Sequence, residues 1–200
     1  MDSSTIVSFA TFALVAAFTP GPNNIMLAAS GANFGFRQTL PHIFGILVGF
    51  CSLLMAAGYG LAELFLIMPW LYDVLKVISI LFLLYFAWKI GSAGHIATKK
   101  KDRPLSFVQA ASFQLINPKA ITVIISSVTA YTSTAGSVGA ELTMLLFVFA
   151  TVTICATCTW AVFGTAIALL LTSQIRLRQF NITMALFLVA SLLPSILSPF

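Results

Sequence analysis

Charged residues are scarce in this sequence. Only 8% of its 200 residues are Asp, Glu, Lys or Arg, whereas 60% are hydrophobic. A typical soluble domain carries about a quarter charged residues, so this chain has too few to cover a surface that faces water. The scarcity excludes an ordinary soluble globular protein. No segment is polar and long enough for a separate soluble domain, and we expect a single transmembrane domain over residues 1–200.

Acidic residues number only five, and each lies near the end of an apolar run: Asp2, Glu63, Asp73, Asp102 and Glu141. The two histidines, His42 and His95, lie in or near predicted loops. The apolar runs therefore contain no deep Ser–His or Asp–Asp pair that could carry out hydrolysis. They also lack a cluster of ligands for a metal. We expect neither enzyme activity nor a metal or other cofactor.

Cysteine occurs three times, always inside an apolar run, at Cys51, Cys155 and Cys158. This placement excludes a secreted disulfide framework. Residues 1–8 contain no Lys or Arg, so we expect no cleavable signal peptide, which would begin with a basic region. The formal net charge of +5 arises from a few basic residues between apolar runs. That pattern is typical of membrane topology determinants and does not indicate nucleic-acid binding.

Long apolar runs are what the sequence has in abundance. A membrane-spanning helix needs roughly 17–25 residues, and six runs are long enough, at about 6–32, 41–60, 71–90, 105–132, 141–171 and 180–196. The sequence therefore predicts an all-α membrane protein whose six transmembrane helices cross the lipid bilayer.

Basic residues alternate between the two sides of these six helices. The loops after the first, third and fifth runs carry most of them, namely Arg37, Lys99, Lys100, Lys101, Arg103, Arg176 and Arg178. Lys89 lies near the same side, and the opposite side has only Lys76. Because cytoplasmic loops are enriched in Lys and Arg, the alternation predicts that both termini lie outside the cytoplasm.

Prolines interrupt two of the six runs. The first run contains "TPGPNN" at 19–24, and the fourth contains "INPKA" at 116–120. Pro20 and Pro118 are 98 residues apart, which is about half the chain. Three helices per half is an odd number, so the second half enters the bilayer from the opposite side. The spacing predicts a 3+3 inverted repeat with halves of about 1–98 and 99–200, in which helices one and four are broken and point to the binding site.

The first break places polar groups inside the membrane. Pro20 and Pro22 cannot donate backbone hydrogen bonds, and irregular backbone at this depth must be buried in protein or face a watery cavity. Asn23 and Asn24 follow at once, where a helix N-terminus favours anions such as carboxylates. We interpret the two asparagines as ligand contacts and the Pro-Gly21-Pro segment as the element that shapes the break. The alternative is an ordinary proline kink in which the asparagines bond the freed backbone.

The second break adds a charge. Lys119 follows Leu105 by 14 residues, which is about 21 Å along a helix. A lysine near the centre of a spanning helix costs roughly 2.5–3.5 kcal/mol on insertion scales. No carboxylate shares its predicted depth, so we predict that a ligand carboxylate is its partner. The alternative is that Lys119 bonds carbonyls freed at the first break. Asn117 is predicted to cap the second half-helix and to join the site, and Pro118 forms the break.

These motifs together resemble the LysE/RhtB family of bacterial amino-acid exporters. "FTPGPNN", "GFRQTLPHIFGILVGF", "YFAWKIG" and "FQLINPKA" occur in the order expected for that family, over roughly residues 10–190. The resemblance implies export of an amino acid across the bacterial cytoplasmic (inner) membrane, driven by the proton gradient. Within the family, the pattern is most similar to exporters of cysteine and O-acetylserine, and exporters of homoserine and threonine are close relatives. The family motifs fall on Pro20, Gly21, Pro22, Asn23 and Asn24, and on Asn117, Pro118 and Lys119.

Weaker patterns leave alternatives open. The C-x-x-C of Cys155 and Cys158 allows a transmembrane thiol–disulfide electron carrier, although a buried free cysteine is commonly just a small hydrophobe. A G-x-x-x-G motif in the second run favours packing within the chain and also allows a homodimer. His42 could relay protons and Trp160 could contact the ligand, but packing is the simpler interpretation of each. A channel without saturable transport is a further alternative.

Overall fold

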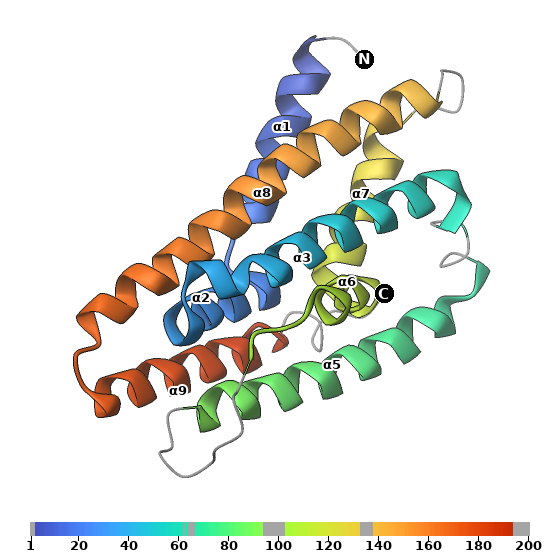
Figure 1. The fold of residues 1–200 in the computed structure, drawn as a ribbon. Helices are drawn as coiled ribbons and strands as arrows, with labels where there is room; N and C mark the ends of the chain where they lie inside the picture. The colour runs from blue at the N-terminus through green and yellow to red at the C-terminus, as the bar shows by residue number, and fades with distance from the viewer. Residues whose placement is uncertain (1–2, 62, 64–66, 94–102, 133–137, 194–200) are drawn as a thin grey trace.

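The computed structural model describes residues 3–61, 63, 67–93, 103–132 and 138–193, and every regular element in these ranges is helical. Eight α-helices and one π-helical turn, η1, follow each other along the chain (Figure 1): α1 (Ser3–Phe18), α2 (Pro22–Phe34), α3 (Phe36–Ala56), η1 (Ala57–Leu61), α5 (Pro69–Ser92), α6 (Phe107–Ile116), α7 (Pro118–Tyr131), α8 (Val138–Leu170) and α9 (Gln174–Ala190). The prediction of an all-α protein is confirmed. Several residues used in the sequence analysis lie outside the described ranges: Asp2, His95, Lys99, Lys100, Lys101 and Asp102.

Three of the described helices are long and apolar enough to span a membrane by themselves, at Phe36–Leu61, Asp73–Ser92 and Val138–Leu170. The pair α1 and α2 qualifies together as a broken span that is bent by 52°. The other helices are shorter, with 10 residues in α6, 14 in α7 and 17 in α9. The structure therefore shows three or four candidate spans among the described residues, whereas the sequence predicted six. Pro118 divides the fourth run into two short helices, and α9 begins with a polar turn.

The surface of the bundle is largely apolar. Large hydrophobic side chains are exposed on several helices, and Leu81 on α5, Phe147 on α8 and Leu169 near the end of α8 are 63%, 73% and 80% exposed. Soluble monomers rarely expose large continuous apolar patches. This surface is suited to contact with lipid.

The two breaks lie where proline predicts them. α1 ends at Phe18 and α2 begins at Pro22, and α6 ends at Ile116 while α7 begins at Pro118. Proline at the first helical position lacks an N–H that the helix could not use there, so each proline starts its new helix without losing a backbone bond. The chain therefore resumes its helical path after each break instead of forming a long loop.

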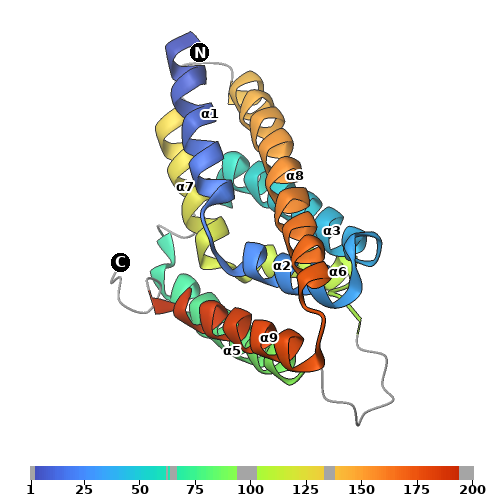
Figure 2. The ribbon, with the colours of Figure 1, turned by 90° about the vertical axis from the view of Figure 1, so that its left-hand side faces the viewer.

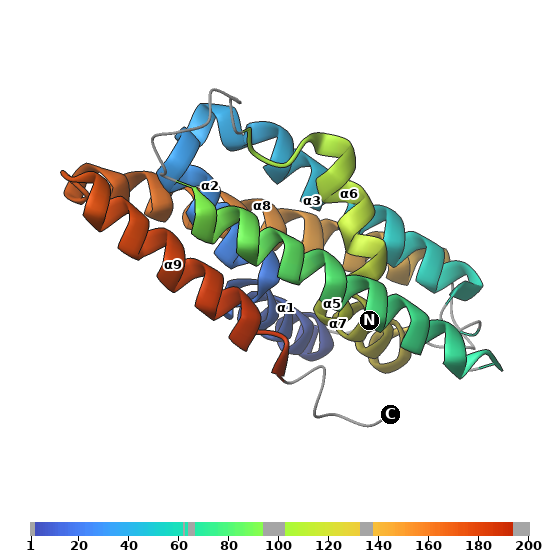
Figure 3. The same ribbon diagram turned by 90° about the horizontal axis from the view of Figure 1, so that it is seen from below.

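The short helix α2 lies at the centre of the molecule. α3 and α8 lie on one side of it, and α5 and α9 lie side by side on the other (Figures 1 and 2). α6 packs against α3 at the edge of the bundle, where Phe107, Val108 and Leu115 are exposed. The view from below shows α5 and α9 as one adjacent pair (Figure 3). Two clusters of buried side chains fill the bundle. One surrounds α2 and α6 and includes Met26 and Phe113. The other lies among α1, α7 and the first half of α8 and includes Phe9 and Ile124.

Glycines allow α2 and α8 to meet at their backbones. A Cβ atom at Gly164 on α8 would lie 2.0 Å from the carbonyl oxygen of Ala28, and one at Gly31 on α2 would lie 2.2 Å from that of Ala161. Real Cβ atoms do not approach other atoms this closely, so only glycine fits at this crossing. Small residues at membrane helix crossings permit such contact.

The crossing of α3 and α6 is built in the same way. Cβ atoms at Gly45 and Gly49 would lie 2.4 Å and 2.6 Å from carbonyl oxygens of Phe107 and Ala111. The G-x-x-x-G motif therefore packs within the chain, as the simpler interpretation of the sequence expected.

Candidate functional site

A partly open cavity lies where the two breaks meet, and its empty space, including the open space at its mouth, is about 560 Å³. Residues from the end of α1, from both breaks and from α3, α7 and α8 line it. All four predicted ligand contacts are among the lining residues: Asn23, Asn24, Asn117 and Lys119. Gly21 and Pro22 also line the cavity, whereas Pro20 and Pro118 are not among the lining residues. The structure thus brings together polar groups that are almost a hundred residues apart in the sequence.

Lys119 reaches from the second break to the first. Its Nζ atom donates a hydrogen bond to the carbonyl oxygen of Thr19 at 2.7 Å. Its side chain lies against Gly21, where an added Cβ would be 3.0 Å from Lys119 Cδ. This is the contact with freed backbone that the sequence analysis kept as an alternative. An ammonium group has three N–H donors, so the bond to Thr19 leaves two of them for another partner. No Asp or Glu in the described part of the chain lines the cavity.

Asn24 stabilises the end of α1. Its Nδ2 atom donates to the carbonyl oxygens of Ala17 at 2.8 Å and Thr19 at 3.0 Å. These are carbonyls that have lost their helical partners at the break, and leaving a buried acceptor unpaired costs about 1–3 kcal/mol. The amide nitrogen is therefore structural, and the Oδ1 atom is the part of Asn24 that can contact a ligand.

Asn23 pairs with a residue that the sequence analysis missed. Asn23 Nδ2 donates to Gln114 Oε1 at 2.8 Å, and Gln114 Nε2 donates back to Asn23 Oδ1 at 3.2 Å. Gln114 Nε2 also bonds the carbonyl oxygen of Ala110 at 2.9 Å, and Gln114 is fully buried. The signal that could have revealed it was an amide side chain three residues before Asn117, inside the apolar run. The pair joins α2 to α6 at the cavity.

Two helices, α2 and α7, begin at the cavity, and only one of them has a side-chain cap at its N-terminus. Asn117 caps α7, as expected, because its Oδ1 atom accepts a hydrogen bond from the backbone N–H of Lys119 at 3.2 Å. The first turn of α2 has no side-chain cap. Uncapped N–H groups at a helix start carry a partial positive charge. The start of α2 and the ammonium of Lys119 therefore both favour an anion in this cavity.

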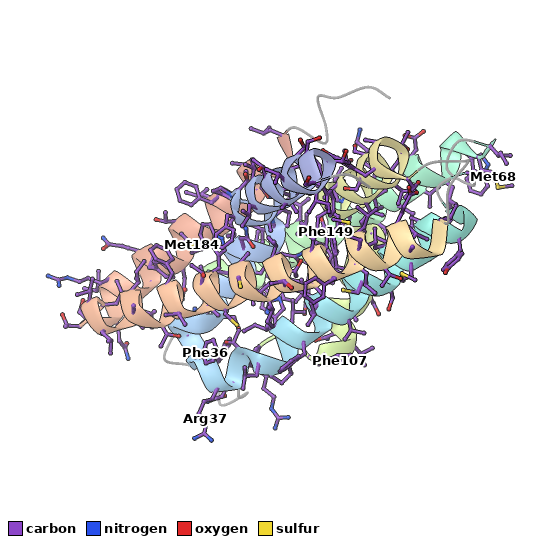
Figure 4. The ribbon with its side chains drawn as sticks, turned by 90° about the horizontal axis from the view of Figure 1, so that it is seen from above. Phe36, Arg37, Met68, Phe107, Phe149 and Met184 are labelled. Atoms are coloured by element: carbon purple, nitrogen blue, oxygen red, sulfur yellow. The ribbon has the colours of Figure 1, made fainter. Side chains whose placement is uncertain are left out.

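Apolar and hydroxyl groups complete the wall. Phe149 on α8 packs between Phe9 and Phe50, with ring centroids 4.9 Å and 5.1 Å away, and lies among the crowded side chains seen from above (Figure 4). Thr153, one turn further along α8, is buried and makes no side-chain hydrogen bond to a described residue. Its hydroxyl is a second lining group that the sequence analysis missed, and its signal was a threonine inside an otherwise apolar run.

The cysteines and Trp160 do not line this cavity. Cys155 is exposed, Cys51 and Cys158 are partly buried, and all three are free thiols. Trp160 packs beside the cluster around α2 and makes an edge contact with Phe163 at 5.8 Å. His42, which the sequence placed near a loop, lies inside α3 and is almost completely buried. His42 lies in the second turn of α3, which begins at Phe36, and the packing of α3 against α2 buries it.

Comparisons with known proteins show the family of this chain. A family model described as LysE type translocator matches residues 14–193. A cysteine/O-acetylserine efflux protein of Salmonella paratyphi A is 28% identical over 131 residues, which cover 66% of this chain and 67% of the relative. A protein of the same name from Escherichia coli O1:K1 / APEC is 31% identical over 122 residues, or 60% of this chain and 62% of the relative. No solved structure matches significantly. The family match covers most of the chain and includes both breaks, and the protein belongs to the LysE type translocator family.

Proposed function

We propose that this protein exports small neutral amino acids or their derivatives from the cytoplasm across the bacterial inner membrane. The observation that carries the proposal is the cavity at the two breaks, in which Lys119 has unused donors and the described wall contains no Asp or Glu. The names of the relatives, which describe efflux of cysteine and O-acetylserine, support the same class of substrate.

The cavity has a group for each end of an amino acid. The carboxylate would bind Lys119 and the uncapped start of α2. The amino group would donate to the free oxygens of Asn24 and Thr153. Alanines at 16, 17, 120 and 156 supply much of the remaining wall, and they leave room for a small side chain. A cationic side chain would find no carboxylate there, so lysine-like substrates are disfavoured.

The chain is proposed to form six transmembrane helices in a 3+3 inverted repeat with both termini outside the cytoplasm. The breaks at α1–α2 and α6–α7 correspond in this scheme, as do the other helices of each half. The contact of α2 with α8 is then a contact between the first and fifth spans, and the contact of α6 with α3 is one between the fourth and second spans. The repeat relates these two contacts to each other, and glycines line both of them. Such paired contacts and broken helices are characteristic of inverted-repeat transporters.

Proton coupling and a homodimer are further parts of the proposal. None of the described residues that line the cavity is acidic and able to carry a proton, so Lys119, His42 and the ammonium of the substrate are the candidate carriers. A homodimer would need a surface other than Gly45 and Gly49, because these glycines contact α6 of the same chain.

The export function is tested by an efflux screen. Cells that overproduce the protein and are loaded with single labelled amino acids should lose cysteine, O-acetylserine, homoserine or threonine faster than cells with an empty vector. Lysine and glutamate serve as charged comparisons and should be retained. A saturable rate separates export from a channel. If none of the neutral compounds leaves faster, the proposed function is wrong.

A cysteine-free variant is the matched control for the electron-carrier alternative. Replacing Cys51, Cys155 and Cys158 by alanine should leave efflux intact, because none of them lines the cavity at the breaks. Loss of efflux at normal membrane levels would instead support the thiol–disulfide carrier.

The topology is tested with fused reporters. A reporter enzyme that is active only outside the cytoplasm should be active after Phe200 and inactive after Lys101, because the basic residues of the third loop are predicted to stay in the cytoplasm. Equal fusion levels on immunoblots are the control. A cytoplasmic C-terminus would contradict the six-helix inverted repeat.

A further inference from the structure

A second cavity lies beside the other end of α2, and its empty space, including the open space at its mouth, is about 450 Å³. Residues of α2, α3 and α5 and of the segment before α6 line it. Asn23 and Asn24 at the start of α2 line the cavity at the breaks, whereas Ser30 and Asn33 near its end line this one. α2 has 13 residues, so the two cavities are separated by no more than about 20 Å along this helix.

Two cations line this inner cavity without an ion-pair partner among the described residues. Lys89 on α5 is half-buried, and its Nζ atom lies 5.5 Å from the centre of the Phe86 ring. Arg103 lies just before α6, and none of the described residues that line the cavity is Asp or Glu. Two cations beside an apolar wall attract an anion more strongly than they would in open water.

His42 adds a buried polar group that has no partner. It is 1% exposed, and neither Nδ1 nor Nε2 has a hydrogen-bond partner. A buried polar group normally has one, and a neutral imidazole offers one donor and one acceptor. His42 lines the same cavity as the two cations.

The other polar groups at this cavity already have partners. Ser30 bonds Thr39 at 3.1 Å, and Asn33 exchanges two hydrogen bonds with Asn181 at 2.7 Å and 3.0 Å. The groups left to recognise a ligand are therefore a histidine and two cations. Together they suit a small molecule that carries a carboxylate and a further hydrogen-bonding group.

We propose that the inner cavity is a second amino-acid site, in which Lys89 and Arg103 bind the carboxylate and His42 bonds a polar group of the substrate. The proposal rests on the exporter function. Lys89 and Arg103 belong to the side of the bundle that basic residues mark as cytoplasmic, which is the side from which an exporter receives its substrate. The substrate would bind here first and then move along α2 to the cavity at the breaks.

The test is transport of labelled L-cysteine, kept reduced, into vesicles of defined orientation. In inside-out vesicles the double variant Lys89→Met/Arg103→Met should raise the half-saturating concentration about tenfold, a loss of about 1.4 kcal/mol in binding. The maximal rate should change little. For counterflow measured from the outer face, the double variant should have the same half-saturating concentration as the wild-type protein. A substrate that enters from outside reaches the cavity at the breaks before the inner cavity.

Matched variants separate a binding role from other effects of charge. Arg37→Met/Arg178→Met removes two charges from the same side without touching either cavity and should leave both half-saturating concentrations unchanged. His42→Leu should raise the value at the cytoplasmic face without lowering thermal stability, since it removes an unpaired polar group. If the double variant fails to reach the membrane, Arg103→Met alone provides the test, because Arg103 is exposed.

Lys89 and Arg103 could also bind the phosphate of a lipid. Transport in vesicles of different lipid composition distinguishes this from binding of a substrate carboxylate. The proposal predicts the same tenfold effect in vesicles of phosphatidylcholine and in vesicles that contain cardiolipin. Two results would overturn the inner amino-acid site and leave the exporter function standing. In one, the double variant raises the half-saturating concentration only in the cardiolipin vesicles. In the other, the wild-type protein transports cysteine and the double variant has the same half-saturating concentration. If the wild-type protein transports none of cysteine, O-acetylserine, homoserine and threonine in the vesicles, both the inner site and the exporter function are overturned.

Discussion

Lys119→Met is expected to abolish export while the folded protein remains in the membrane. The fold should survive because the carbonyl oxygen of Thr19, which Lys119 bonds, keeps its hydrogen bond from Asn24. Removing the deep charge also relieves an insertion cost of roughly 2.5–3.5 kcal/mol. Export should be lost because the substrate carboxylate loses its cation, and truncating one partner of a buried charge pair costs about 2–5 kcal/mol.

The measurement is efflux of labelled amino acid divided by the amount of protein in the membrane. Lys119→Arg should be impaired but not inactive, because a planar guanidinium does not reproduce the geometry of a compact ammonium. Lys76→Met, on α5 and outside both cavities, is the control for loss of a lysine. Efflux at the wild-type rate in Lys119→Met would show that the Lys119–Thr19 contact is purely structural and that the substrate binds elsewhere.

Gly164→Ala is expected to destabilise the protein markedly, although alanine is normally the better helix former. Exchange of glycine for alanine inside a helix gains about 0.8–1.0 kcal/mol in propensity. At Gly164 the added methyl would lie 2.0 Å from the carbonyl oxygen of Ala28. The obstacle is backbone, so no side-chain rotation can relieve it, and α2 must move away from α8. Overpacking typically costs 1–3 kcal/mol and occasionally more.

Gly139→Ala is the matched control, because it makes the same substitution in the same helix at a position with nothing within 4 Å. Thermal unfolding of the detergent-purified proteins should show a lower midpoint for Gly164→Ala and an unchanged or slightly higher one for Gly139→Ala. Equal midpoints would mean that α2 and α8 do not touch as described. Because α2 lines both cavities, loss of export should accompany the loss of stability.

Local properties of the sequence were enough to predict much of the fold. Each of the six apolar runs overlaps a helix or a pair of helices, since hydrophobicity and length determine which segments can be helical in lipid. The breaks could be located because proline acts on its own helix. The same local reasoning identified Asn117 as a cap and brought Lys119 to attention as a deep charge. The number of spans was not confirmed: the sequence predicted six, and the described residues contain three or four candidate spans, because a run divided by proline yields helices shorter than a span.

The partners of the polar residues depended on the tertiary structure alone. The sequence left open whether Lys119 bonds backbone carbonyls or a ligand. In the structure its ammonium donates a hydrogen bond to the carbonyl oxygen of Thr19, which is 100 residues away in the sequence. Asn23 pairs with Gln114 over a separation of 91 residues. His42 became a buried group without a partner only when α3 packed into the bundle. Hydrophobic pattern and proline act within a few residues, whereas a hydrogen bond between two breaks requires that both halves of the chain be packed together.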